Sequence, residues 1–280
     1  MKVYTYNDKV LTNSANGKWL KAPDVDPLNP LGLPEYTIRI KMAPGSSAPS
    51  ISGATVTAVA GQTDVYDVYK ANSNWTSLLY YQSNLIEVLG ANTSDVTNMA
   101  SMFGRCSALT SVSLFDTSNV TAMNNMFESC SHLTTVPQFD TSNVTTMKEM
   151  FNYCTALTSV PLFNTSNVTD MSSTFNYCNA LTSVPQFNTS NVTTMNSTFN
   201  SCSSLTSVPL FNTSKVTNMY YTFYGCTNVQ SGALALYQQA STQTTIPEQY
   251  YYCFKNCGSN TVTGAAELAQ IPASWGGTGA

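Results

Sequence analysis

The sequence predicts a β/α solenoid of strand, turn and short-helix units, with a small β-rich N-terminal region and a C-terminal cap. Two recurrences predict it. A phenylalanine opens near-identical 24-residue segments at Phe115, Phe139, Phe163, Phe187 and Phe211. A cysteine recurs at the same spacing from Cys106 to Cys226. Because no unit of this size buries its own apolar residues, the units are expected to stack.

Each unit divides into two halves. In one copy Val144, Met147, Phe151 and Cys154 follow the spacing of an apolar helical stripe. The polar residues before Val144 suit a helix N-terminus. The other half, residues 157–163, is rich in β-branched and apolar residues and contains Pro161, so it is expected to be extended. The predicted unit is therefore a strand, a turn and a short helix.

The period defines the organisation of the second half of the chain. The solenoid is expected over 85–226, and residues 72–83 form an imperfect coil with Trp75 and Leu79 in the interior columns. Residues 227–280 form a C-terminal cap and tail. Within the cap, residues 231–240 predict a helix, and Phe254 with Cys257 restores the F-x-x-C pattern.

The chain before the repeats differs in composition. Residues 36–84 form a β-rich region that includes the N-terminal cap coil, with strands expected at 37–42, 54–60 and 65–69. Residues 1–35 are interpreted as an attachment segment and proline-rich linker. A hairpin is expected within residues 3–21, with Asn16-Gly17 as its turn.

Composition limits the function classes. Charged residues make up 9% of the chain, against about 25% in ordinary soluble domains. A net charge of −4 without a basic run argues against nucleic acid as a partner. No apolar run is long enough to insert into a membrane, and the N-terminus lacks the apolar core of a secretory signal. The polar, weakly charged surface favours an extracellular adhesin or a virus particle.

Catalytic chemistry is not evident, so we expect no enzyme, no cofactor, and no catalytic or metal-binding residue. The single histidine, His132, occupies a variable repeat position. Asp116 and Asp140 share a column that continues as asparagine, which favours a capping role over acid–base catalysis. Cys253 and Cys257 lack a second His/Cys cluster for zinc. They are read as an extra thiol and a member of the cysteine column, and whether either forms a disulfide is left open.

Two sets of residues are candidates for a binding surface. The residue before each repeat phenylalanine alternates, which indicates a half-exposed strand face for a partner or another protomer, or else a history of duplication. This set is Leu114, Gln138, Leu162, Gln186 and Leu210. The second set consists of tyrosines suited to protein or sugar contacts, or to packing between coils. It comprises Tyr153, Tyr177, Tyr220, Tyr221 and Tyr224.

The unit L-T-S-V-P-x-F-[DN]-T-S-N-V-T-x-M-x-x-x-F-x-x-C resembles the BspA-like leucine-rich repeat of bacterial surface proteins, including its mycoplasma-type variant. The resemblance covers residues 85–226, about half the chain. It implies a leucine-rich-repeat-like solenoid and an adhesin that binds host matrix or cells. The flanks at 84–94, 231–241 and 263–272 resemble structural proteins of gut Bacteroidales phages, including crAss-like phages. That resemblance implies a head fibre, decoration protein or tail adhesin.

The resulting hypothesis is a non-enzymatic phage virion structural protein. Residues 1–35 would attach it to other virion proteins, and the solenoid would bind a host-surface protein or glycan from the virion surface. The fibre analogy implies a homo-oligomer, in particular a trimer. The alternative is a bacterial BspA-like adhesin at the cell surface. A glycan-cleaving enzyme is a third class, which the missing site chemistry disfavours.

Overall fold

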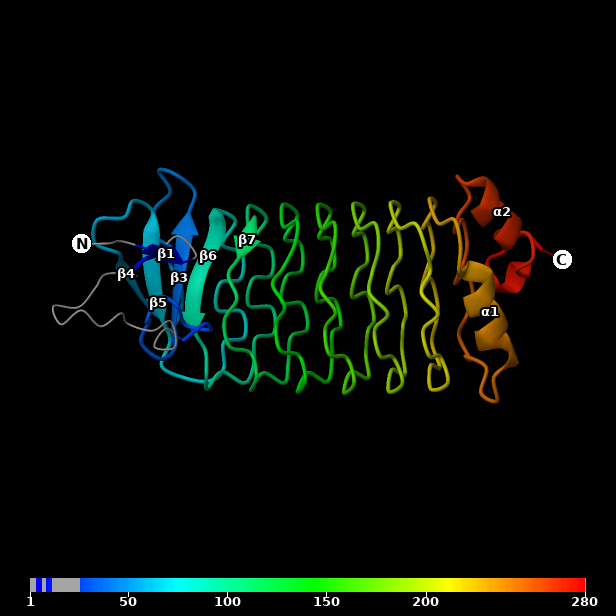
Figure 1. The fold of residues 1–280 in the computed structure, drawn as a ribbon, viewed down its shortest axis with the longest axis horizontal. Coiled ribbons are helices and arrows are strands. Elements are labelled where there is room, and N and C mark those ends of the chain that lie inside the picture. The colour runs from blue at the N-terminus through cyan, green and yellow to red at the C-terminus, as the bar shows by residue number, and fades with distance from the viewer. Residues whose placement is uncertain (1–3, 7–8, 12–25, 280) are drawn as a thin grey trace.

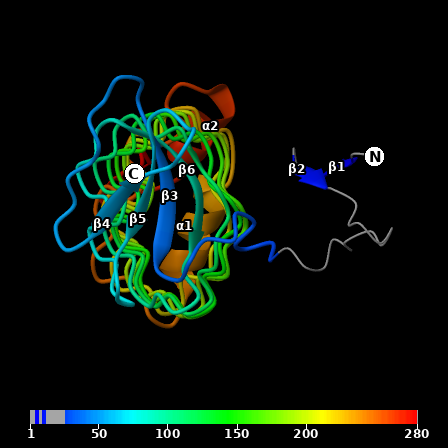
Figure 2. The ribbon, with the colours of Figure 1, turned by 90° about the vertical axis from the view of Figure 1, so that its left-hand side faces the viewer.

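The computed structural model describes residues 4–6, 9–11 and 26–279. A small sheet lies at one end, two helices lie at the other, and a row of similar coils fills the length between them (Figure 1). Viewed along this length, the coils superpose on one another (Figure 2). The molecule is thus a stack in which each coil contacts mainly the coil before it and the coil after it.

The N-terminal strands are β1 (Tyr4–Tyr6) and β2 (Lys9–Leu11), which pair antiparallel. The expected hairpin turn at Asn16-Gly17 lies outside the described residues, as does most of segment 1–35. Residues 37–69 contribute β3 (Thr37–Met42), β4 (Thr55–Ala58) and β5 (Val65–Tyr69). The predicted strands of the β-rich region are therefore present.

One sheet joins this region to the repeats. Its strand order is β4-β5-β3-β6-β7, where β6 spans Leu85–Asn92 and β7 spans Ser111–Val112. β3 runs antiparallel to both β5 and β6, whereas β6 and β7 are parallel. Ile38 and Ile40 face the core, and Arg39 on the other face pairs with Asp67 at 2.7 Å. The sheet thus continues across the boundary expected at residue 84.

Parallel backbone bridges hold the coils together. They link equivalent residues 24 apart, in the series Asn98, Ala122, Thr146, Asp170, Thr194 and Asn218. Hydrogen bonds between neighbouring coils accompany each bridge, for example from Thr169 N–H to the Thr145 carbonyl at 2.9 Å. The sequence period is therefore also the spatial period.

The prediction of a short helix in each repeat is wrong. A series of tight turns takes the place of the helix. In the coil at 147–154, the N–H groups of Glu149 and Tyr153 donate to the next coil, and those of Asn152 and Cys154 donate three residues back. Glu149 and Tyr153 have φ of 57° and 59°, and the equivalent residues of other coils are also left-handed. An α-helix needs negative φ throughout. The apolar spacing misleads because these turns place Met147, Phe151 and Cys154 on one side, as a helix would.

The predicted repeat strand is also largely absent, because a proline removes its donor. Among the described repeats the regular strands are β6 and β7, and Ser113 after β7 donates its N–H to the Val88 carbonyl at 2.9 Å. The equivalent residues are Pro137, Pro161, Pro185 and Pro209. In those coils the phenylalanine two residues after the proline donates its backbone N–H to the proline carbonyl, as Phe163 does to Pro161 at 3.0 Å. The segment therefore stays extended but does not form the regular hydrogen bonds of a β-sheet with its neighbours.

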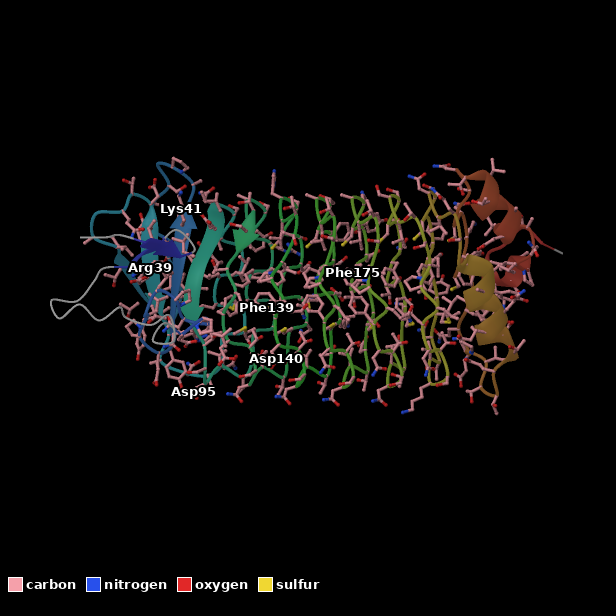
Figure 3. The ribbon with its side chains drawn as sticks, viewed as in Figure 1. Arg39, Lys41, Asp95, Phe139, Asp140 and Phe175 are labelled. Carbon is pink, nitrogen blue, oxygen red and sulfur yellow. The ribbon has the colours of Figure 1, made fainter. Side chains whose placement is uncertain are left out.

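Aromatic rings and thiols fill the interior. One phenylalanine column, from Phe103 to Phe223, stacks with ring centroids between 5.1 and 5.6 Å apart. Phe163 from the extended side meets Phe151 from the turn side at 6.2 Å. Figure 3 shows Phe139 and Phe175 inside the stack. Since a buried phenylalanine contributes about 1.5–3 kcal/mol, these columns are the main apolar core.

Both ends of the core are closed. Trp75 is fully buried in the first coil, where its backbone N–H donates to the Asn98 carbonyl at 2.8 Å. At the other end, Phe254 stacks on Phe223 at 5.9 Å, so the 31-residue step restores the column as expected. The C-terminal elements are α1 (Ala233–Thr242), α2 (Val262–Leu268) and a 3-10 turn at Ala273–Trp275. Trp275 covers the last coil by packing on Tyr250 at 4.4 Å.

Candidate binding surfaces

Two outward surfaces arise from the two sides of each coil. The turn side and the extended side pack against each other through their phenylalanines, as Phe151 does on Phe163. Residues that point outward from the two sides therefore lie on opposite surfaces of the stack. We call them the turn face, formed by the turns at 124–129, 148–153, 172–177, 196–201 and 220–225, and the Leu–Gln face, formed by Leu114, Gln138, Leu162, Gln186 and Leu210.

The turn face carries all five tyrosines singled out in the sequence. Its outward positions are the first, second, fifth and sixth of each six-residue turn, while the third and fourth are buried. All but three of these outward residues are Asn, Ser, Tyr or Gly, and the exceptions are Glu128, Lys148 and Glu149. Most are half-buried or exposed. The turn face is therefore amide-, hydroxyl- and tyrosine-rich with little charge.

Tyr153 and Tyr177 form one aromatic pair on this face. Their rings stack with centroids 4.7 Å apart and an interplanar angle of 5°, and the side chains are 45% and 37% exposed. Ser129 and Ser201 take the same position in the coils on either side. The outer face of each ring is thus bordered by a small side chain.

The other three tyrosines form a second group at the C-terminal end. Tyr221 lies 4.9 Å from Tyr224 and 4.1 Å from Tyr220 between ring centroids. A hydrogen bond with Tyr220 raises the pKa of Tyr221 above its ordinary value. Sequence reasoning missed Tyr252, which stacks on Tyr221 at 5.6 Å and carries the Lys255 ammonium 4.7 Å above its ring. Tyr221 and Tyr252 are 31 residues apart, which is the same step that separates Cys226 from Cys257, so this spacing could have identified Tyr252 as the equivalent of Tyr221.

The Leu–Gln face shows that the alternation has a structural basis. Leu114, Leu162 and Leu210 are 37%, 58% and 53% exposed. Gln138 donates its amide to the Leu162 carbonyl at 2.9 Å, and Gln186 does the same to Leu210. The proline-containing segment leaves this carbonyl without a backbone partner, so the glutamine supplies one.

A shallow hollow of about 510 Å³ lies on the Leu–Gln face around Leu162. Gln138 and Gln186 border it on two sides, and Asp140, Asn164 and Asn188 form its polar rim. The hollow is centred on Leu162, the middle member of the predicted set.

The Asp116 and Asp140 column forms Asx turns. Each side-chain oxygen accepts the N–H two residues on, as Asp140 does from Ser142 at 2.9 Å. Asn164 and Asn188 repeat this bond in the following coils. Hydrogen bonds from Ser142 hold the pKa of Asp140 below its ordinary value. The expected structural role is present, although the residues stabilise a turn rather than a helix.

The cysteines form a buried column of free thiols. All eight are buried and unpaired by disulfides, including Cys253 and Cys257. Those from Cys106 to Cys226 donate S–H to a carbonyl 27 residues earlier, as Cys154 does to Phe127 at 3.0 Å. Burial raises the pKa of Cys106 to about 12 and raises the pKa of Cys154 further. These thiols are protected from water and held in the neutral state.

The remaining polar residues do not assemble into a reactive cluster. His132 is exposed, and its Nδ1 lies 2.6 Å from the Ser107 carbonyl. In residues 4–6, 9–11 and 26–279, no three His, Cys, Asp or Glu side chains are placed to hold a metal ion. Over the same described ranges, no helix is both long and apolar enough to cross a membrane.

Comparison with known proteins gives one family match. The family model described as "Mycoplasma protein of unknown function, DUF285" matches residues 67–180 and 157–260. No curated protein sequence matches the chain. A crystal structure of the leucine-rich-repeat protein of T. pallidum is 19% identical with a TM-score of 0.42, and the match covers 61% of this chain and 75% of that one. A structure of a TLR13–ssRNA13 complex is 16% identical with a TM-score of 0.26, over 60% and 30% of the two chains.

Proposed function

The chain belongs to the DUF285 family, a BspA-like repeat family, and from this premise we propose that it is a non-enzymatic surface-binding protein. In this proposal the coils form a leucine-rich-repeat-like solenoid, and the turn face binds a protein or glycan on the surface of a host cell. The chain itself is carried on the outside of a particle or a cell.

The observation that carries the proposal is the contrast between the interior and the turn face. Interior columns repeat the same residue types from coil to coil, whereas the outward turn positions vary. The varying residues are chiefly Asn, Ser and Tyr. This is also the composition of antibody binding loops, where tyrosine supplies rigid contact area and the small polar residues supply adaptable hydrogen bonds. A fixed scaffold under a varying surface suits recognition.

The polar groups support a binding role over a catalytic one. A general base must reach the proton that it removes and must be oriented by a neighbour. The His132 ring instead contacts a backbone carbonyl, and Asp140 is committed to its own turn. The buried thiols are neutral at physiological pH, which disfavours them as nucleophiles.

We propose two alternatives for the structure that carries this chain on its surface: a phage particle or a bacterial cell. The phage-like flanks favour a virion surface, with residues 1–35 attached to other virion proteins, whereas the family favours a bacterial cell surface. Electron microscopy with a gold-labelled antibody to this chain distinguishes them. Label on phage particles supports the first carrier, label on intact bacterial cells supports the second, and label inside cells alone contradicts both.

Binding is tested with the full chain on a glycan array and on immobilised proteins from host-cell surfaces. The variant Tyr153→Ser/Tyr177→Ser copies the serines found at this position in neighbouring coils, so the fold is expected to remain. Because exposed tyrosines carry much of the energy at interfaces, we expect affinity to fall at least about tenfold. Thr158→Ser on the opposite side is the control. Absence of binding to both ligand classes, or equal affinity of the two variants, contradicts the proposal.

A further inference from the structure

Other residues of the same chain cover the Leu–Gln face at both of its ends along the stack. One coil before Leu114 the same position is Gly90, and a Cβ built there would lie 2.9 Å from the Leu31 side chain, so Leu31 covers this end. One coil after Leu210 the position is Leu234, which lies in α1 and packs against the core. The open part of the face is therefore five coils long, from Leu114 to Leu210.

Those five coils read Leu, Gln, Leu, Gln, Leu, which is the same in both directions around Leu162. A two-fold axis produces an interface only where a patch is complementary to itself. We propose that the Leu–Gln face binds a second copy of this chain, with the two stacks antiparallel and the two-fold axis passing at Leu162. Leu162 then meets its own equivalent, Leu114 meets Leu210, and Gln138 meets Gln186.

The charges on this face select the antiparallel arrangement. In the five extended segments from 109–118 to 205–214, the charged residues are Asp116 and Asp140 alone. The same column continues as Asn164, Asn188 and Asn212. An antiparallel pair places Asp140 opposite Asn188, and Asp116 opposite Asn212, so each carboxylate meets an amide donor. In a parallel pair the two-fold axis runs along the stack, so the Asp column of each copy faces the proline side of the other and neither carboxylate meets an amide donor.

The polar residues on the face have bonding capacity left for a partner. Gln138 uses one amide hydrogen for the Leu162 carbonyl, and a glutamine amide has a second hydrogen and an acceptor oxygen. Gln186 likewise uses one amide hydrogen, for the Leu210 carbonyl, and keeps the same remaining capacity. Across the two-fold axis these two amides can bond to each other. The hollow of about 510 Å³ around Leu162 leaves room for the side chains of the second copy.

This pairing leaves the turn faces free. Because the turn face lies on the opposite side of the core, a dimer formed through the Leu–Gln faces directs its two turn faces outward. Two binding surfaces on one particle raise the effective affinity for a ligand displayed in many copies. The inference does not depend on the proposed ligand, since it concerns a different surface and a different measurement.

Sedimentation velocity of the full chain tests the association. We expect a concentration-dependent species of twice the 30.3 kDa monomer mass. Leu162→Glu places two carboxylates at the axis and is expected to raise the dissociation constant at least about tenfold. Tyr153→Glu on the turn face is the matched control and leaves it unchanged. Circular dichroism checks that both variants are folded. A monomer up to roughly 1 mM, a trimer, or an unaffected Leu162→Glu variant overturns the proposal.

Disulfide trapping tests the orientation, and the native thiols do not interfere because they are buried. Leu114 and its own equivalent would lie four coil spacings apart, roughly 19 Å, which is too far for a disulfide. Leu114→Cys alone and Leu210→Cys alone are therefore expected to stay uncrosslinked, whereas an oxidised mixture of the two gives a covalent dimer. Crosslinking of either variant with itself overturns the antiparallel arrangement. Loss of ligand binding by a dimer that still forms contradicts only the proposed function.

Discussion

The side-chain amide of Gln138 donates a hydrogen bond of 2.9 Å to the backbone carbonyl of Leu162 in the next coil. The same bond joins Gln186 to Leu210. An alternation visible in the sequence as a two-repeat pattern is thus a way of pairing carbonyls in a segment where proline prevents a backbone ladder.

Replacing this glutamine tests its contribution to stability. Gln138→Ala is expected to lower the free energy of unfolding by about 1 kcal/mol, because the Leu162 carbonyl loses its partner. Urea unfolding followed by circular dichroism measures the change. Thr182→Ala is a less suitable comparison because its hydroxyl also bonds between coils. Ser183→Ala, whose hydroxyl is exposed, serves as the control and is expected to change little.

Left-handed residues in the turns are sites where glycine should stabilise. Ser173 has φ of 53°, a conformation that costs a residue with a Cβ about 1–2 kcal/mol. Ser173→Gly removes this strain but makes the unfolded chain more flexible, so a net gain of about 0.5–1 kcal/mol is expected. Ser183→Gly, at an exposed position outside the left-handed set, is expected to destabilise. Equal effects of the two variants in thermal unfolding would contradict the assignment of strain.

Glu267 holds the two C-terminal helices together. Its carboxylate accepts the N–H groups of Gly232 and Leu234 at 3.3 and 3.1 Å, at the start of α1. No local side chain caps this end. Glu267→Ala is expected to lower stability by about 1 kcal/mol and to speed hydrogen exchange at the Leu234 amide. The control Glu248→Ala changes an exposed carboxylate, and equal exchange in the two variants would refute the capping role.

The thiol column predicts weakening in alkali. Burial raises the pKa of Cys106 from 9.0 to about 12, and the other buried thiols also shift upward. The folded protein therefore keeps protons that the unfolded chain releases above pH 9. This stabilisation is complete below pH 9 and is lost as the pH rises toward 12.

Urea unfolding at a series of pH values above 9 measures this loss. Cys154→Ala removes one thiol and leaves every tyrosine in place. The fall in stability with pH should therefore be shallower in this variant by about one proton, or about 1.4 kcal/mol per pH unit. Identical slopes in the two proteins would mean that the thiols ionise without unfolding.

The repeat period identified the interior correctly. Phe151, Cys154 and Leu157 are all fully buried, as their columns predict. The degraded first coil at Trp75 and the restored column at Phe254 were also identifiable from spacing. These features follow from one-dimensional stacking, in which equivalent residues of successive coils share one environment.

Local conformation was less predictable. The stripe of Met147, Phe151 and Cys154 satisfies both a helix and a series of turns, and bonding to the next coil selects the turns. Left-handed φ at Glu149 and Tyr153 opposes local preference, so these residues give no signal of their own in the sequence. Tyr252 stacks on Tyr221 of the turn face although it lies 31 residues further along the chain, so a search at the 24-residue period misses it.

The sequence by itself determined the period, the buried columns, the closed ends and the two sets of outward residues, because each depends on which residues recur. The tertiary structure alone decided that turns replace helices and that the tyrosines and the Leu–Gln set lie on opposite sides. Both outcomes depend on hydrogen bonds and packing between residues that are about 24 positions apart. Local propensity does not include those contacts.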